Sequence, residues 1–428
     1  MNLSDLYDLY LHHRRITTDS RDCPKGSVFF ALKGEKFDGN RYAEKALQAG
    51  CSYAVIDDPQ YEVPDRTVLV DNVLDTLQQL ARMHRKAMNI PVIGITGTNG
   101  KTTTKELIAA VLSSKFNILY TEGNLNNQIG VPLTLLRLTH EHELAVIEMG
   151  ASHPGDITEL VRIAQPNYGI ITNIGKAHLE GFGSFEGVLH TKGELYDYIR
   201  KTKGKIFIKK ENTLLQSIAS GIEQITYGSS EDAFAYGKAL PSASPFLVFE
   251  WRQQGKTHQV ETRLIGDYNL DNALVAIALG RYFKIPSERI CRAIASYEPS
   301  NNRSQLMRTA RNTVIVDAYN ANPSSMKAAL DNFAALDVRP KAVILGDMRE
   351  LGETSDEEHA AVVALLKEGN YDKVYLCGEH FLKAAGSFQA FATGEELNRA
   401  LTSASLEGYH ILLKGSHGMH LEDTIPLL

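Results

Sequence analysis

The sequence predicts an α/β protein of three domains: a small α/β domain, a central domain with a doubly wound, mostly parallel sheet, and a C-terminal Rossmann-like domain. Three observations support this prediction. The chain has 428 residues, a length that suggests two to four domains. From about residue 90 onward, apolar runs typical of buried strands alternate with stretches of helical spacing. A turn-rich stretch, Pro299-Ser300-Asn301-Asn302, interrupts this alternation, which then starts again.

The first domain is expected to span residues 1–84. It contains three short apolar runs, at residues 28–32, 54–56 and 68–70, and each predicts a buried strand. One helix is expected here, because apolar residues recur at helical spacing over residues 74–88. We expect this helix to bridge to the second domain.

The second domain is expected to span residues 85–298 and the third residues 299–428. In the second, strands are predicted at residues 92–95, 144–147 and 168–172, a hairpin around Gln254-Gly255, and a helix over residues 270–283. In the third, strands are predicted at residues 313–316, 341–345, 373–376 and 410–413, with helices between them.

Composition and charge argue against several classes of partner and location. The formal net charge of −6 argues against a nucleic-acid or membrane-surface partner. The four cysteines lie far apart, match no metal-binding spacing and are expected to be reduced thiols. The first residues lack a basic region followed by an apolar run, and no apolar stretch is long enough to span a bilayer. These features predict a cytoplasmic protein.

The most informative motif is a glycine loop at residues 94–105, Gly-Ile-Thr-Gly-Thr-Asn-Gly-Lys-Thr-Thr-Thr-Lys, directly after a predicted strand. Such a loop points backbone N–H groups at phosphates, at the start of a helix. The predicted nucleotide-binding residues are Gly97, Thr98, Asn99, Gly100, Lys101, Thr102 and Thr103. Lys101 is expected to reach the outer phosphates and the Thr102 hydroxyl to bind Mg²⁺. The loop therefore predicts a nucleoside triphosphate as the energy source.

One position of this loop departs from the usual pattern. The first glycine of the common phosphate-loop motif is replaced by Ile95. The alternative interpretation is an ordinary glycine turn between a strand and a helix, and the Lys-Thr-Thr at the helix start argues against it.

Polar residues at predicted strand ends are further candidates, because ligands of open α/β sheets bind beyond the carboxyl ends of the strands. Glu148 follows the strand at 144–147 and is expected to bind Mg²⁺; a helix cap or a solvent-facing acid is the alternative. His178 follows the strand at 168–172, and alone it would be read as structural or exposed. Lys192 alone would be read as a surface lysine on a helix. Asp317 ends another strand, where a capping turn is the alternative to a binding loop.

Taken together, these stretches resemble the Mur ligases of bacterial cell-wall synthesis over nearly the whole chain. The glycine loop is similar to that of the wider superfamily, which includes folylpolyglutamate synthase. Four further stretches resemble the branch of the family that adds D-alanyl-D-alanine: residues 124–130 (Asn-Leu-Asn-Asn-Gln-Ile-Gly), 148–152 (Glu-Met-Gly-Ala-Ser), 319–323 (Tyr-Asn-Ala-Asn-Pro) and 345–352 (Leu-Gly-Asp-Met-Arg-Glu-Leu-Gly).

The resemblance implies roles for particular residues. Lys101, Glu148, His178 and Lys192 match catalytic positions, and the metal ligands would be Thr102, Glu148, His178 and Lys192, the last as a carbamate that helps to hold a second Mg²⁺. The nucleotide contacts would also include Asn272, Arg303 and Asp317. Substrate contacts would be Ser20 and Arg21, with residues 34–40, at the uridine nucleotide, and Asn126, Asn127, Tyr319, Asn320, Asn322, Lys414 and Ser416 elsewhere.

Three positions depart from the family pattern. Thr191 stands where alanine usually precedes the carbamate lysine, and His417 stands where arginine often follows Lys-Gly-Ser. Residues 300–307 keep an arginine and a glutamine without the usual spacing. The last two departures concern the contacts of the C-terminal domain.

The resemblance implies an ATP-dependent ligase, expected to be a monomer, that joins D-alanyl-D-alanine to the terminal carboxylate of UDP-N-acetylmuramoyl-tripeptide through an acyl phosphate. Two alternatives stay open. The chain would otherwise be another amino-acid ligase of the superfamily, or a phosphate-loop NTPase that couples hydrolysis to motion.

Overall fold

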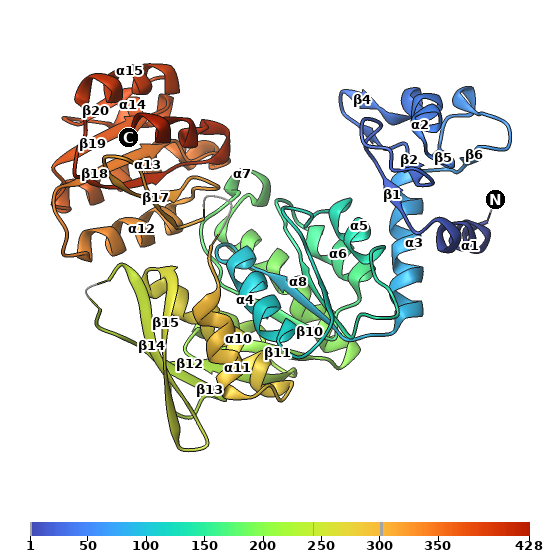
Figure 1. Cartoon of the computed structure of the whole chain (residues 1–428), viewed down its shortest axis with the longest axis horizontal. Coiled ribbons are helices and arrows are strands. Elements are labelled where there is room, and N and C mark those ends of the chain that lie inside the picture. Colours follow the sequence, from blue (N-terminus) through green and yellow to red (C-terminus); the bar gives the residue numbers. More distant parts are fainter. Residues whose placement is uncertain (1, 243, 300–302) are drawn as a thin grey trace.

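A computed structural model describes residues 2–242, 244–299 and 303–428 (Figure 1). Most of the predicted turn at residues 299–302 therefore lies outside the described residues. The described chain forms sheets of four, nine and six strands and one two-stranded hairpin, with helices packed against the three larger sheets. This architecture confirms the predicted α/β class with three domains.

The first sheet is small and entirely parallel, in the order β1-β2-β5-β6. Its strands are β1 (Ile16–Thr17), β2 (Val28–Phe30), β5 (Tyr53–Ile56) and β6 (Thr67–Leu69). The helices are α1 (Leu3–His13), α2 (Ala43–Ala49) and α3 (Val73–Met88). The three predicted strands and α3 are confirmed, but the prediction of a single helix is wrong. Helix α1 buries Leu6, Tyr7 and Tyr10, a helical spacing that the sequence prediction overlooked because the segment is short and lies at the start of the chain.

The central sheet has the order β15-β14-β13-β12-β11-β10-β7-β9-β8 and is parallel from β8 to β13. Its strands are β7 (Val92–Thr96), β8 (Ile118–Tyr120), β9 (Leu144–Glu148), β10 (Tyr168–Ile171), β11 (Lys205–Lys209), β12 (Glu223–Gly228), β13 (Ala235–Leu240), β14 (Phe246–Gln253) and β15 (Lys256–Ile265). The antiparallel pair β14–β15 lies at one edge, which confirms the predicted hairpin.

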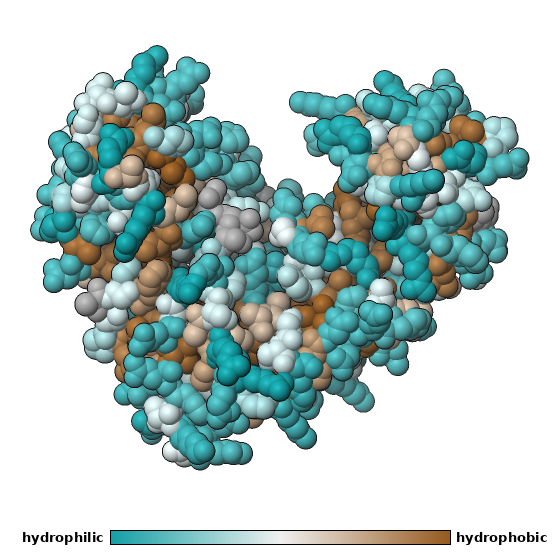
Figure 2. Space-filling model, in the orientation of Figure 1, coloured by the Kyte–Doolittle hydropathy of each residue, from teal (hydrophilic) through white to brown (hydrophobic). Residues whose placement is uncertain are grey.

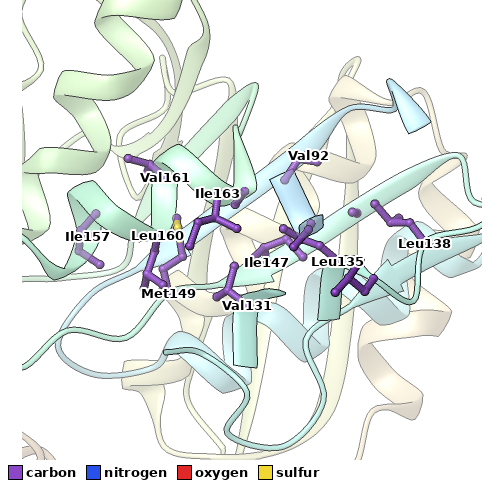
Figure 3. Packing of buried hydrophobic residues seen from close by; sticks show 14 of the residues in the cluster. Val92, Val131, Leu135, Leu138, Ile147, Met149, Ile157, Leu160, Val161 and Ile163 are labelled. Carbon is purple, nitrogen blue, oxygen red and sulfur yellow. The ribbon is translucent and has the colours of Figure 1, made fainter. Parts of the chain in front are cut away.

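Helices cover both faces of this sheet, as expected for a doubly wound domain. One face packs on α5 (Gly130–Leu135), α6 (Asp156–Ala164) and α8 (Phe185–Thr202), and Figure 3 shows Val92 and Ile147 of the sheet among the apolar side chains of α5 and α6. The other face packs on α4 (Lys101–Ser113), α10 (Leu270–Tyr282) and α11 (Ser287–Ser296). Buried α10 lies against α4 and so supports the helix that follows the glycine loop.

The third sheet has the order β16-β17-β21-β18-β19-β20, and only β16 is antiparallel to its neighbour. Its strands are β16 (Gln305–Arg308), β17 (Thr313–Asp317), β18 (Lys341–Gly346), β19 (Lys373–Cys377), β20 (Gln389–Phe391) and β21 (His410–Lys414). Its helices are α12 (Pro323–Ala335), α13 (Ser355–Glu368), α14 (Glu379–Ala384) and α15 (Gly394–Ala404). The four predicted strands are confirmed.

The first and third domains stand at opposite ends of the central domain (Figure 1), and Figure 2 shows the molecule hollowed between them. The predicted boundary at residue 84 falls inside α3, where the buried His84 ring contacts Tyr7 Oη at 3.1 Å and the Leu138 carbonyl at 2.9 Å. The first two domains therefore share one core. Within the described residues, no helix is long and apolar enough to cross a membrane.

Candidate active site

A cleft of about 740 Å³ lies where the carboxyl ends of the central strands face the third domain. It brings together most of the predicted site residues. Those that line it are Thr98, Asn99, Gly100, Lys101, Thr102, Thr103, Asn126, Asn127, Glu148, His178, Asn272, Arg303, Asp317, Tyr319, Asn320 and Lys414. Gly97, Lys192, Asn322, Ser416, Ser20 and Arg21 are not among its lining residues.

The glycine loop connects β7 to α4 and is fixed by hydrogen bonds with residues 172 and 173, which directly follow β10, the neighbouring strand in the sheet. Gly97 has φ of +142°, and a Cβ there would lie 1.9 Å from the Thr172 hydroxyl oxygen, so only glycine fits. Thr172 Oγ1 donates to the Asn99 carbonyl at 2.6 Å, and the Asn99 N–H donates to the Asn173 side chain at 3.0 Å. Asn272, the predicted nucleotide contact, packs beside Gly100 and accepts a hydrogen bond from Thr104 Oγ1 at 2.9 Å.

Lys101 is the first residue of α4, and its side chain folds back over the loop. Its ammonium donates to the carbonyls of Gly97 at 2.7 Å and Thr98 at 3.0 Å. Removal from water lowers the pKa of Lys101; the Glu148 carboxylate opposes this shift, and the Arg303 guanidinium adds to it. A cation thus lies at the loop, at the N-terminus of a helix, where phosphate oxygens are favoured.

Glu148 is the last residue of β9 and is buried, with 1% of its surface exposed. Its carboxylate accepts hydrogen bonds from Thr102 Oγ1 at 3.0 Å and from Asn126 Nδ2 at 2.9 Å. Burial at a strand end excludes both alternatives, a helix cap and a solvent-facing acid. Carboxylate and hydroxyl oxygens side by side form a donor set that suits Mg²⁺.

His178 lies in the loop after β10, with φ of +51°. Its Nδ1 faces the carboxylate of Glu350, which belongs to the third domain. The close imidazole lowers the pKa of Glu350, and burial opposes this shift. Sequence reasoning assigned no role to Glu350, although it lies within the quoted stretch 345–352.

Lys192 lies on the inner face of α8 and is 2% exposed, so its interpretation as a surface lysine is wrong. Its ammonium lies 5.4 Å from the centre of the Phe182 ring. Burial moves the pKa of Lys192 well below its usual value, Lys101 adds to the shift, and Asp156 opposes it. Across the described residues, no three His, Cys, Asp or Glu side chains form a cluster that suits a metal.

The third domain contributes a second wall, built on the ends of β17 and β21. The buried Lys414 ammonium contacts Asp317 Oδ2 at 2.7 Å and the Asn320 carbonyl at 3.1 Å. The Arg303 guanidinium carbon lies 3.6 Å from the centre of the Tyr319 ring. The wall therefore presents two features to the same cleft: the ion pair of Asp317 with Lys414, and the Arg303 guanidinium stacked on the Tyr319 ring.

Two predicted residues of the third domain have other partners. Asn322 caps α12 and also donates to Asn99 Oδ1 of the glycine loop at 2.8 Å. The predicted alternative, a capping turn, thus applies to Asn322 and not to Asp317. Ser416 Oγ accepts the Arg349 N–H at 3.0 Å.

Ser20 and Arg21 lie in the first domain, apart from the cleft. Arg21 is exposed and pairs with Asp19 at 2.7 Å, which lowers the pKa of the Asp19 carboxyl to about 2. Residues 34–40 contain the end of β3 (Lys33–Gly34) and β4 (Phe37–Asp38), which form the small hairpin. The structure does not bring these residues to the glycine loop.

The glycine loop at the start of α4, with a buried acid beside it and a Rossmann-like domain facing it, defines a three-domain protein of the phosphate-loop α/β class. Profiles of one family match nearly the whole chain: "Mur ligase family, catalytic domain" over residues 12–85, "Mur ligase middle domain" over 95–280 and "Mur ligase, glutamate ligase domain" over 302–417. The chain belongs to the Mur ligase family.

Curated relatives agree with this assignment. The UDP-N-acetylmuramoyl-tripeptide–D-alanyl-D-alanine ligases of Bacillus subtilis and Escherichia coli are each 34% identical to the chain, over 96% of it and 92% and 93% of their own lengths. A crystal structure of MurF from Acinetobacter baumannii superposes with a TM-score of 0.86 at 30% identity, over 96% of this chain and 92% of that one. MurF ligase from Thermotoga maritima, solved in complex with ADP, gives 0.85 at 27% identity, over 98% and 97%.

Proposed function

We propose that the chain is an ATP-dependent ligase that joins D-alanyl-D-alanine to the terminal carboxylate of UDP-N-acetylmuramoyl-tripeptide and releases ADP and phosphate. The names of the two curated relatives describe these substrates. The observation that carries the proposal is the cleft itself, in which Lys101 of the glycine loop faces the Asp317–Lys414 wall of another domain. Such a cleft encloses both a phosphate donor and an acyl acceptor.

The chemistry requires a better leaving group than oxide. A carboxylate oxygen of the tripeptide attacks the γ-phosphorus of ATP, the bond from that phosphorus to the β–γ bridging oxygen breaks, and ADP leaves. The amine of D-alanyl-D-alanine then attacks the acyl carbon, loses a proton, and phosphate departs with the carboxylate oxygen. Lys101 neutralises charge on the transferred phosphoryl group, and the two walls position the reactants and exclude water.

The residues around Glu148 fit a first Mg²⁺. Two buried oxygen donors, the Glu148 carboxylate and the Thr102 hydroxyl, lie together at the start of α4. When bound there, the metal neutralises phosphate charge. Asn126 holds the other carboxylate oxygen and so fixes the orientation of the acid.

For a second Mg²⁺ we propose His178 and a carbamate on Lys192. A carbamate forms from carbon dioxide and a neutral amine, and the lowered pKa of Lys192 favours the neutral amine. Modification replaces the buried amine with an anion whose oxygens suit a hard metal. In the unmodified protein Lys192 is not among the residues that line the cleft.

The remaining predicted residues complete the proposal. Asn272, Arg303 and Asp317 contact the nucleotide, and Asn126, Asn127, Tyr319, Asn320 and Lys414 contact the substrates. Ser20 and Arg21 bind the uridine diphosphate, and the hollow between the domains leaves room for the peptide to extend from there to the glycine loop (Figure 2).

Stoichiometry tests the proposal. With ATP, Mg²⁺, a defined UDP-muramoyl tripeptide and D-alanyl-D-alanine, phosphate release is expected only when acid and amine are both present, at one phosphate per peptide bond. Phosphate release without the amine would indicate an NTPase. Turnover with a different amino acid and none with D-alanyl-D-alanine would indicate another ligase of the superfamily. Tripeptides that differ at position three identify the preferred diamino acid.

A further inference from the structure

The loop after β18, residues 347–350, is held at three successive backbone N–H groups. The Asp347 N–H donates to the Cys377 carbonyl, the Met348 N–H to His359 Nε2, and the Arg349 N–H to Ser416 Oγ, each at 3.0 Å. A loop fixed at three adjacent residues has little freedom to move as a whole.

Glu350 follows these residues and has φ of +64°, a left-handed conformation that is uncommon for a residue with a side chain. Its carbonyl accepts the Glu180 N–H of the central domain at 3.4 Å, and its carboxylate faces His178 Nδ1. The three fixed N–H groups thus aim Glu350 across the domain interface, and the strain at Glu350 is sustained by them.

His359, the partner of the Met348 N–H, lies on α13 and has no exposed surface. Because Nε2 accepts the Met348 N–H, the proton of the neutral ring is on Nδ1, which donates to the Ser355 carbonyl at 2.6 Å. The ring stacks on His380 at 5.0 Å and meets Phe381 edge-on at 4.7 Å. Both nitrogens have partners and the ring is fully buried, so His359 contacts no substrate.

We propose that His359 is a positioning residue for the ligase reaction: through the Met348 N–H it holds the 347–350 loop so that Glu350 meets His178. The inference rests on the proposed function, because His178 matters only as part of that site. Carboxylates that hold a functional histidine fix its ring orientation and its tautomer. A displacement of about 1 Å in such a group costs up to ~10²-fold in rate.

The test uses three variants of the full chain. In His359→Gln the side-chain oxygen can still accept the Met348 N–H. In His359→Asn the side chain can still donate to the Ser355 carbonyl but does not reach the Met348 N–H. His359→Leu removes both hydrogen bonds. We expect kcat to fall about 10- to 100-fold in the Asn and Leu variants, with little change in the KM for ATP, and Gln to restore most of it. Hydrogen exchange of the 347–352 segment should accelerate in the same two variants.

His84→Leu is the matched control, because His84 is also buried and bonded at both nitrogens but lies in α3. It should lower Tm and leave kcat unchanged. In a Glu350→Gln background, His359→Leu should cost little further kcat. The inference is overturned if His359→Leu lowers only Tm, if the two losses multiply, or if exchange of the segment is unchanged. A wild-type protein that does not ligate D-alanyl-D-alanine refutes the proposed function, and the exchange experiment still decides whether His359 holds the loop.

Discussion

The two walls of the cleft are built differently. The central-domain wall is assembled from residues close in the sequence or on adjacent strands: Lys101 bonds Gly97 and Thr98, and Thr102 bonds Glu148. The third-domain wall is joined to the central domain through partners far apart in sequence, Asn322 with Asn99 of the glycine loop and Glu350 with His178 after β10. The contacts of the first wall therefore lie within one domain, whereas the position of the second wall against it depends on how two domains dock.

The contacts between the central and third domains are both apolar and polar: Ile265 and Phe246 of the central sheet pack against the apolar core of the third domain, and polar pairs lie around the cleft. Lys176 pairs with Glu358 at 2.5 Å, and Tyr268 Oη lies 3.0 Å from Ser304 Oγ. The proposed reaction needs closure over a water-sensitive acyl phosphate, and the polar pairs around the cleft are contacts that closure would make or break. The comparison suggests that the central wall governs the chemistry and the second wall governs closure.

The largest effect is expected at the central wall. Lys101→Ala should lower kcat by about 10²-fold or more while the protein stays folded, because the lysine neutralises phosphoryl charge and does not pack in the core. Steady-state kinetics with matched circular dichroism measure both. Lys115→Ala, beyond the C-terminal end of the same helix, is the control and should be near normal. Near-normal turnover of Lys101→Ala would mean that the glycine loop of the central domain does not take part in the chemical step.

Substitutions of Lys192 test whether this buried residue, which does not line the cleft, takes part in the reaction as a carbamate. Lys192→Ala should be nearly inactive and partly restored by short carboxylates, and Lys192→Arg should also fail, because guanidinium forms no carbamate and stays charged. Activity in buffer depleted of carbon dioxide, with and without bicarbonate, measures the modification directly. Full activity of Lys192→Arg would mean that the lysine has no such role.

Arg21 extends the comparison to the first domain. Arg21→Ala should raise the KM for the UDP substrate about 10-fold and leave the KM for ATP nearly unchanged, since it removes one charge-assisted phosphate contact. Initial rates with each substrate varied in turn separate the two constants. Equal changes in both would place the uridine nucleotide elsewhere.

The smallest effect is expected where the walls meet. Asn322→Ser retains a good helix cap but is too short to reach Asn99, so Tm should hold while kcat falls about 2- to 10-fold, the value of one hydrogen bond. Asn322→Ala should lose the cap as well and show a lower Tm. Unchanged kcat in Asn322→Ser would mean that this contact does not contribute to closure.

The sequence predicted the buried strands well, because β7, β9 and β10 are short apolar runs followed by turn residues. In the central sheet it missed β8, only three residues long, and β11, β12 and β13, where charged or polar residues or glycine interrupt the apolar runs. It also missed the edge strands β1, β16 and β20, which are short or only partly buried. Patterns also failed to predict the burial of Lys192, since a lysine on a helix is usually exposed. The roles of Glu350 and His359 could not be predicted from the sequence, because they depend on contacts between segments that are distant along the chain.

The fate of one oxygen atom tests the central claim most directly. UDP-N-acetylmuramoyl-tripeptide labelled with ¹⁸O in its terminal carboxylate should, in the presence of ATP, Mg²⁺ and D-alanyl-D-alanine, yield phosphate that carries one ¹⁸O per peptide bond formed. That transfer occurs only if the carboxylate attacked the γ-phosphorus and the amine displaced the phosphate. Phosphate free of the label would mean that water attacked ATP, and it would contradict the assignment of this cleft to acyl-phosphate chemistry.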